Sequence, residues 1–155
     1  MKYLIVLLFI YSTNSFSEPG ELDGKGLSCI INQKQKWSEG AFYNEFAIIF
    51  KGYHGYLWKI KIKKNSTKLE KLKMWNYGAD NSFIYLGSKL GMINRKSLEI
   101  SMSYNLDGIK TETELSAKCK VVKVRKLKKF IKKKTKEVGL IIEEKFKKAR
   151  EGNKI

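Results

Sequence analysis

Apolar and polar residues alternate along most of the chain between residues 27 and 121, with the period of two that is typical of β-strands. The clearest run covers residues 56–63, where Trp58 and Ile60 alternate with Lys59 and Lys61. Further runs cover residues 27–31, 46–50, 72–74, 83–85, 90–92, 98–104 and 115–121. We expect about eight short strands, each with one dry, apolar face and one wet face that carries the lysines.

Short segments rich in Gly, Asn, Asp and Ser separate these runs and predict turns. They cover residues 52–55, 64–67, 77–81, 87–89, 94–97 and 105–108. Many short strands at regular spacing favour a mainly β fold, either an antiparallel barrel or a sandwich.

After Val124 the apolar residues recur every three or four positions, which predicts a C-terminal amphipathic α-helix. The expected organisation is a β domain over residues 18–124, with a basic helix and tail over residues 125–155 packed on it. Gly139 lies within the helical pattern and favours a kink or a break into two helices. We expect the apolar stripe to be buried against the β domain; it comprises Phe130, Ile131, Ile141, Ile142 and Phe146.

The first seventeen residues have the layout of a secretory signal peptide. Lys2 precedes an apolar run over residues 3–11, and Ser15 and Ser17 are the small residues of a cleavage site. Cleavage near Ser17 predicts an exported protein, periplasmic or extracellular. The alternative is an uncleaved N-terminal anchor, although the apolar run is shorter than the ~20 residues of a membrane-spanning helix.

Cys29 and Cys119 are the two cysteines of the chain, and they fall on the apolar faces of the first and last predicted strands. In an oxidising compartment such a pair predicts a disulfide, and the alternative is two buried free thiols. The first and last strands are neighbours in a closed barrel but lie at opposite edges of an open sheet. A Cys29–Cys119 bond therefore favours closure of the sheet.

The charge of the chain is strongly positive and lies mostly near the C-terminus. The formal net charge is +17, and without Lys2 the 31 basic and 15 acidic residues give +16. Residues 120–155 contribute +11 of this charge, because they hold fifteen basic and four acidic residues. The helix is thus the predicted contact for an anionic lipid or other polyanion. The candidate contact residues are Lys126, Lys128, Lys129, Lys132, Lys133, Lys136, Lys147 and Lys148.

A second interpretation of the lysines is compositional, since a chain rich in Lys, Ile and Asn is what an AT-rich genome encodes. Only three basic residues are Arg, the residue that binds phosphate in bidentate fashion, so we do not expect specific nucleic-acid binding.

His54 is the only histidine and lies in a predicted loop. No motif supplies it with a nucleophile, and no cluster of cysteine and histidine has metal-ligand spacing. We expect a protein that is not an enzyme, with no catalytic residue, metal site or cofactor.

Several short motifs are similar to those of a group of uncharacterised small exported proteins of marine alphaproteobacteria. They are Leu22–Cys29 (LDGKGLSC, of the form LxGxxLxC), the turn and strand Asn94–Ile100 (NRKSLEI), the late Cys119, and the lysine-rich helix that ends in Gly-Asn-Lys-Ile. The ending departs from the group's KKNKI-like pattern in the charge before Asn153. The resemblance implies a signal peptide, a disulfide and a small β fold, and does not extend to an activity.

These observations predict a small exported β-barrel that acts as a binding module, with a small apolar ligand in the barrel or a protein partner at its rim. The alternative is an envelope-associated protein that docks on an anionic membrane or polyanion through its basic C-terminal helix.

Overall fold

The computed structural model describes residues 22–32, 42–64, 66–87, 91–103 and 114–152. The predicted signal peptide and its cleavage site lie outside the described residues, as does the turn predicted at residues 105–108.

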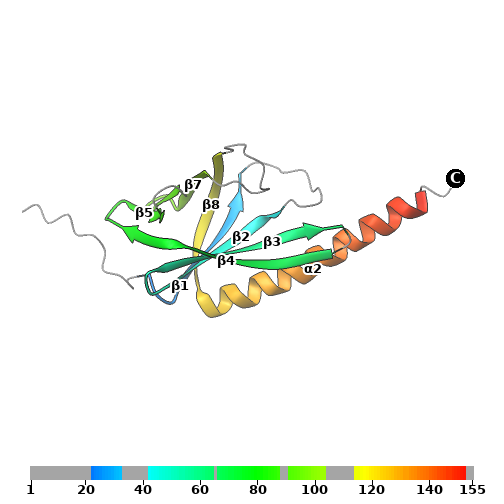
Figure 1. Cartoon of the computed structure of the whole chain (residues 1–155), viewed down its shortest axis with the longest axis horizontal. Coiled ribbons are helices and arrows are strands. Elements are labelled where there is room, and N and C mark those ends of the chain that lie inside the picture. Colours follow the sequence, from blue (N-terminus) through cyan, green and yellow to red (C-terminus); the bar gives the residue numbers. More distant parts are fainter. Residues whose placement is uncertain (1–21, 33–41, 65, 88–90, 104–113, 153–155) are drawn as a thin grey trace, which may run out of the picture.

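The described strands form one closed antiparallel barrel in which each strand pairs with the next along the chain and the last pairs with the first. The strands are β1 (Lys25–Ile31), β2 (Phe42–Lys51), β3 (His54–Lys63), β4 (Ser66–Ala79), β5 (Phe83–Leu86), β6 (Gly91–Asn94), β7 (Glu99–Ser103) and β8 (Glu114–Lys123). A single long helix, α2 (Val124–Gly152), follows β8 (Figure 1). The predicted fold class is confirmed, and it is a barrel and not a sandwich.

The barrel closes where β1 pairs with β8, and the two cysteines lie directly opposite each other in that ladder. Cys29 and Cys119 form the predicted disulfide, and both are buried. A cross-strand bond between the first and last strands joins residues 90 positions apart in sequence. It therefore removes much of the conformational freedom of the unfolded chain while stabilising the closing ladder.

The barrel interior is filled by one cluster of buried aliphatic and aromatic side chains together with the disulfide. Ile48, Ile93 and Ile100 are among its fully buried members. An eight-stranded barrel is just wide enough for its own side chains to fill the interior, which fits this arrangement.

Helix α2 packs on the outside of the barrel, across β1, β2, β4 and β8 (Figure 1). Two apolar clusters lie beneath it. The first joins Leu127 and Ile131 to outward-facing residues of β2 and β3, and the second joins Val138 and Ile142 to Ile62. The helix starts close to β1 because Gly26 has no side chain to oppose Leu127. In consequence β2 is apolar on both faces over residues 46–50.

Two polar contacts fix the helix against the hairpin of β3 and β4 and against β2. The Thr67 hydroxyl donates a hydrogen bond to the carbonyl of Thr135 over 2.9 Å. The ammonium of Lys134 lies 3.0 Å from the Glu45 carboxylate, and this hydrogen bond raises the pKa of Lys134. Both partners of this ion pair are half-buried, so the pair adds modestly to the apolar contacts beneath the helix.

Gly139 does not break α2 into two helices, which was one of the two outcomes expected from the sequence, since the helix is continuous from Val124 to Gly152. The residue lies where the helix crosses the β3–β4 hairpin, and a Cβ at this position would lie 3.1 Å from the Thr67 hydroxyl oxygen. The glycine therefore serves close packing, and tertiary contacts outweigh its low helix propensity.

We expect the disulfide to contribute about 4–5 kcal/mol to the free energy of unfolding, as the chain-entropy description gives for a loop of this length. Urea unfolding of the Cys29→Ala/Cys119→Ala double variant, compared with the oxidised protein, measures this difference. Equal unfolding midpoints and slopes for the two proteins would contradict it.

A second prediction concerns Gly139. Replacing a helical glycine by alanine gains about 1 kcal/mol from helix propensity alone. We expect Gly139→Ala to gain much less in the wild type, because its Cβ displaces the Thr67 hydroxyl from Thr135.

The matched background is Thr67→Ala, in which the hydroxyl is absent and Gly139→Ala should give the full gain. A double-mutant cycle by thermal or urea unfolding measures this coupling, and an identical effect of Gly139→Ala in the two backgrounds would exclude it.

Candidate functional site

The outward face of α2 is the most basic surface of the described chain. The helix carries twelve basic and four acidic residues, a net charge of +8. All eight lysines predicted as anion contacts are exposed; they are Lys126, Lys128, Lys129, Lys132, Lys133, Lys136, Lys147 and Lys148. The structure thus places all eight lysines on one continuous helix. Their role as anion contacts stays a prediction.

Few of these charges are neutralised within the described residues. Lys133 pairs with Glu137 over 3.7 Å and Lys148 pairs with Glu144 over 2.8 Å, each one helical turn away. The other six form no ion pair with the described part of the chain, although the Lys128 ammonium lies 5.8 Å from the centroid of the Trp58 ring. Six accessible charges on one helix give a strong local positive potential.

The first turn of α2 carries Arg125 and Lys126 and no acidic residue. Backbone N–H groups already give a helix N-terminus a partial positive charge, so cations there oppose the helix dipole. Helix stability therefore does not account for these two residues.

Two apolar side chains on this helix remain exposed where the sequence predicted burial. Ile131 and Ile142 are buried and Phe146 is half-buried as expected, but Phe130 is 41 % exposed and Ile141 is 43 % exposed. Phe130 and Ile141 are eleven positions apart, so they lie on nearly the same side of the helix, about 16 Å apart along its axis. The buried stripe is narrower than the apolar stripe in the sequence, because a barrel wall contacts only one side of a helix.

Lys59 and Lys61 of β3 lie on the inner face of the barrel wall, whereas the sequence predicted that they would face solvent. Leu57 belongs to the interior cluster while Trp58 and Ile60 lie beneath α2, so the alternating Lys59 and Lys61 point inward. Lys59 is only 5 % exposed. Its ammonium lies 3.6 Å from the Glu70 carboxylate, and that of Lys61 lies 3.7 Å from the same group. The inversion arises because α2 covers the other face of β3.

His54 is the first residue of β3 and not part of a loop as predicted. Its Nδ1 is buried and has no hydrogen-bond partner in the described chain, and its ring meets that of Tyr56 edge-on at 6.5 Å. Across the described ranges, no group of three His, Cys, Asp or Glu residues could hold a metal ion. Within the described residues, His54 is therefore not part of a metal-ligand set.

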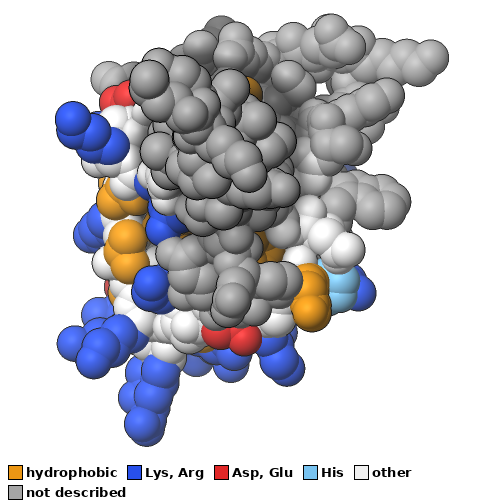
Figure 2. All heavy atoms as spheres, turned by 90° about the vertical axis from the view of Figure 1, so that its left-hand side faces the viewer, with side chains coloured by type: hydrophobic (Ala, Val, Ile, Leu, Met, Phe, Trp, Pro, Cys, Tyr) orange, Lys and Arg blue, Asp and Glu red, His pale blue; other side chains and the backbone are white. Residues whose placement is uncertain are grey.

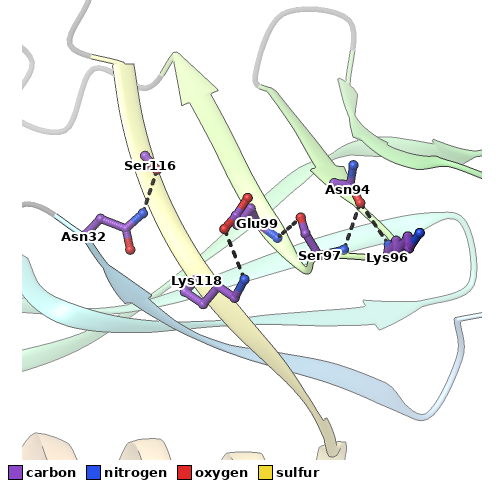
Figure 3. A network of polar contacts seen from close by, with 7 residues as sticks. All are labelled: Asn32, Asn94, Lys96, Ser97, Glu99, Ser116 and Lys118. Carbon is purple, nitrogen blue, oxygen red and sulfur yellow. Dashed lines mark hydrogen bonds and ion pairs between the residues drawn. The ribbon is translucent and has the colours of Figure 1, made fainter.

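The polar residues of β7 and β8 form local, structural contacts (Figure 3). The Glu99 carboxylate accepts a hydrogen bond from Lys118 over 3.1 Å, which lowers the pKa of Glu99. The Asn94 side chain accepts hydrogen bonds from the N–H groups of Lys96 and Ser97 and so stabilises the predicted turn. Both side chains of the Glu99–Lys118 pair are more than half exposed, so we assign it little energetic weight.

In the view of Figure 2, Lys and Arg side chains lie mainly along the left and lower sides of the visible surface, with few Asp and Glu among them. Exposed lysines also lie on the barrel and its turns, among them Lys51 and Lys96. Positive charge is therefore not confined to α2, and any test of the helix needs a comparison with lysines on the barrel.

We expect Glu70→Gln to lower the free energy of unfolding by about 2 kcal/mol, because it removes the carboxylate that lies 3.6 Å from the buried Lys59 ammonium. Glu99→Gln is the matched control, since it removes an exposed pair and should change stability by less than about 0.5 kcal/mol. Urea unfolding of both variants at neutral pH measures the difference. Equal destabilisation by the two would show that Glu70 does not compensate a buried charge.

In the described residues, no helix is both long enough and apolar enough to cross a membrane. No protein-family model, curated protein or solved structure matches this chain. The resemblance to small exported proteins therefore stays a prediction, and function has to be inferred from the surfaces of the molecule.

Proposed function

We propose that this protein is an exported, non-catalytic binding module that docks on anionic membrane surfaces through α2. The observation that carries the proposal is the row of exposed lysines on a helix held rigidly against the barrel, six of them without an ion-pair partner in the described chain. A buried disulfide, typical of proteins from oxidising compartments, supports the exported location.

The exposed Phe130 and Ile141 favour a lipid surface over a soluble polyanion. Apolar side chains flanked by lysines can enter the boundary between headgroups and acyl chains while the ammonium groups remain among the lipid phosphates. A soluble polyanion would bind the lysines and gain little from Phe130 or Ile141. Each lysine held near an anionic bilayer contributes about 1 kcal/mol, so four to six of them suffice for measurable binding at low salt.

A small apolar ligand inside the barrel receives less support, because the interior is occupied by its own buried side chains. A protein partner at the barrel remains compatible with docking by α2, since the two use different surfaces.

The test uses residues 18–155 and vesicles of phosphatidylcholine with or without phosphatidylglycerol. Deleting the helix would expose the apolar outer face of β2 and β3, so charge substitution is the cleaner change. Replacing Lys129, Lys132, Lys136 and Lys147 by Gln should lower partitioning onto anionic vesicles about a hundredfold or more at low salt. Co-sedimentation measures the partitioning.

The control variant replaces four exposed lysines of the barrel and its turns, Lys51, Lys63, Lys96 and Lys120, by Gln. It has the same net charge as the helix variant, so similar losses in both would show that overall charge and not α2 determines binding. Binding should also weaken as salt shortens the Debye length from about 10 Å at 0.1 M to about 3 Å at 1 M.

A Phe130→Ser/Ile141→Ser variant distinguishes the two kinds of anion. We expect it to bind heparin like the wild type but to bind anionic vesicles more weakly, because only the bilayer accepts the two apolar side chains. Thermal unfolding checks that the fold is kept. Unchanged vesicle binding would contradict insertion and would favour a soluble polyanion.

A further inference from the structure

Strand β4 is much longer than β5, one of the two strands that pair with it. It has fourteen residues, whereas β5 has four. β4 pairs with β3 from Ser66 to Asn76, but with β5 only from Tyr77 to Ala79. In the described part of the chain, residues 66–76 therefore have a hydrogen-bonded strand on one side only, and Figure 1 shows β4 continuing beyond the short β5.

The register of the β3–β4 hairpin indicates which backbone groups face this open edge. Lys63 pairs with Ser66 across a two-residue connection, and such a closing pair is hydrogen-bonded in a tight hairpin. Opposed pairs then alternate between hydrogen-bonded and non-hydrogen-bonded along the ladder. Leu69, Lys71 and Lys73 fall on non-hydrogen-bonded pairs, so their N–H and C=O groups point away from β3.

The side chains of this edge carry positive charge next to apolar surface. Lys68, Lys71 and Lys73 are exposed, while Leu69 and Leu72 are half-buried. The one acidic residue of the stretch, Glu70, already faces Lys59 and Lys61. The Lys71 ammonium lies 4.7 Å from the centroid of the Trp58 ring, which holds its charge beside the edge.

This charge pattern selects the kind of strand that could pair there. A second copy of the chain, added edge to edge, would place lysines against lysines, and lysines on edge strands oppose such self-association. An acidic strand would instead place carboxylates beside Lys71 and Lys73, which share the outward face of β4, and opposite charges across a ladder stabilise pairing.

We propose that the free edge of β4 binds an extended acidic segment of a partner protein as an added strand. The backbone groups of Leu69, Lys71 and Lys73 form the ladder, carboxylates on one face of the partner strand lie beside Lys71 and Lys73, and small apolar residues on its other face pack against Leu72. This site adjoins α2, since Lys71 and Lys128 both lie near the Trp58 ring, but it uses the backbone edge of β4 and does not depend on membrane docking.

The experiment uses residues 18–155 and two capped peptides of equal length and charge, one of alternating Glu and Val and one of alternating Glu and Pro. The Glu–Pro peptide keeps the carboxylates but has half the N–H donors and cannot form a regular ladder. We expect the Glu–Val peptide to bind at least about tenfold more tightly at physiological salt, measured by calorimetry. Equal affinities would mean charge attraction alone and would overturn the proposal.

Amide hydrogen exchange locates the contact. Saturation with the Glu–Val peptide should slow exchange of the Leu69, Lys71 and Lys73 amides, and protection confined to α2 or to another strand would also overturn the proposal. Because this measurement uses the wild-type chain, it does not depend on any variant folding.

A pair of variants separates the backbone from the charge. Lys71→Pro removes an N–H group from the open edge and should abolish the preference for Glu–Val over Glu–Pro. Lys71→Gln removes only the charge and should weaken binding of both peptides while keeping that preference. The variant with four α2 lysines replaced by Gln should retain the preference, so failure of membrane docking and failure of this site are distinguishable.

Discussion

The contact between α2 and the outer wall of the barrel determines the environment of many residues elsewhere. Leu127, Ile131, Val138 and Ile142 bury a face of β2 and β3 that would otherwise meet solvent. The opposite face of the same strands lines the barrel interior, so these strands have no wet face over much of their length. The charged residues that alternate with Trp58 and Ile60 are therefore directed inward, where Glu70 compensates them.

The sequence contains enough information for the architecture because three independent signals agree. Alternation of apolar residues predicts the strands, the change of period after Val124 predicts the helix, and the positions of Cys29 and Cys119 predict closure between β1 and β8. Each signal is local or involves one pair of residues. Local signals are recoverable without knowledge of how the elements pack.

The errors arise where packing between elements decides the outcome. A period of two distinguishes the two faces of β3 but does not indicate which face is interior. Lys59 was therefore expected to face solvent, whereas it is only 5 % exposed. Gly139 looks like a helix breaker until Thr67 is seen to occupy the space of its side chain. The open edge of β4 could not be predicted from the sequence either, because it depends on the different lengths of β4 and β5 and not on either strand alone. The lysines of α2 were identified correctly as exposed candidates, yet composition alone explains a lysine-rich chain equally well.

The pairing of β1 with β8 also has a consequence for the order in which the chain folds. β1 cannot acquire its second neighbour until residue 123 has been synthesised, and α2 follows later still. During that interval the meander from β1 to β7 has two unsatisfied edges and an uncovered apolar outer wall, which is the condition that favours misassociation of growing chains. Contacts between such distant residues form slowly. A nascent chain of this protein is therefore most vulnerable to aggregation just before its last quarter is made. The apolar outer wall is buried only when α2, the last element, packs on it.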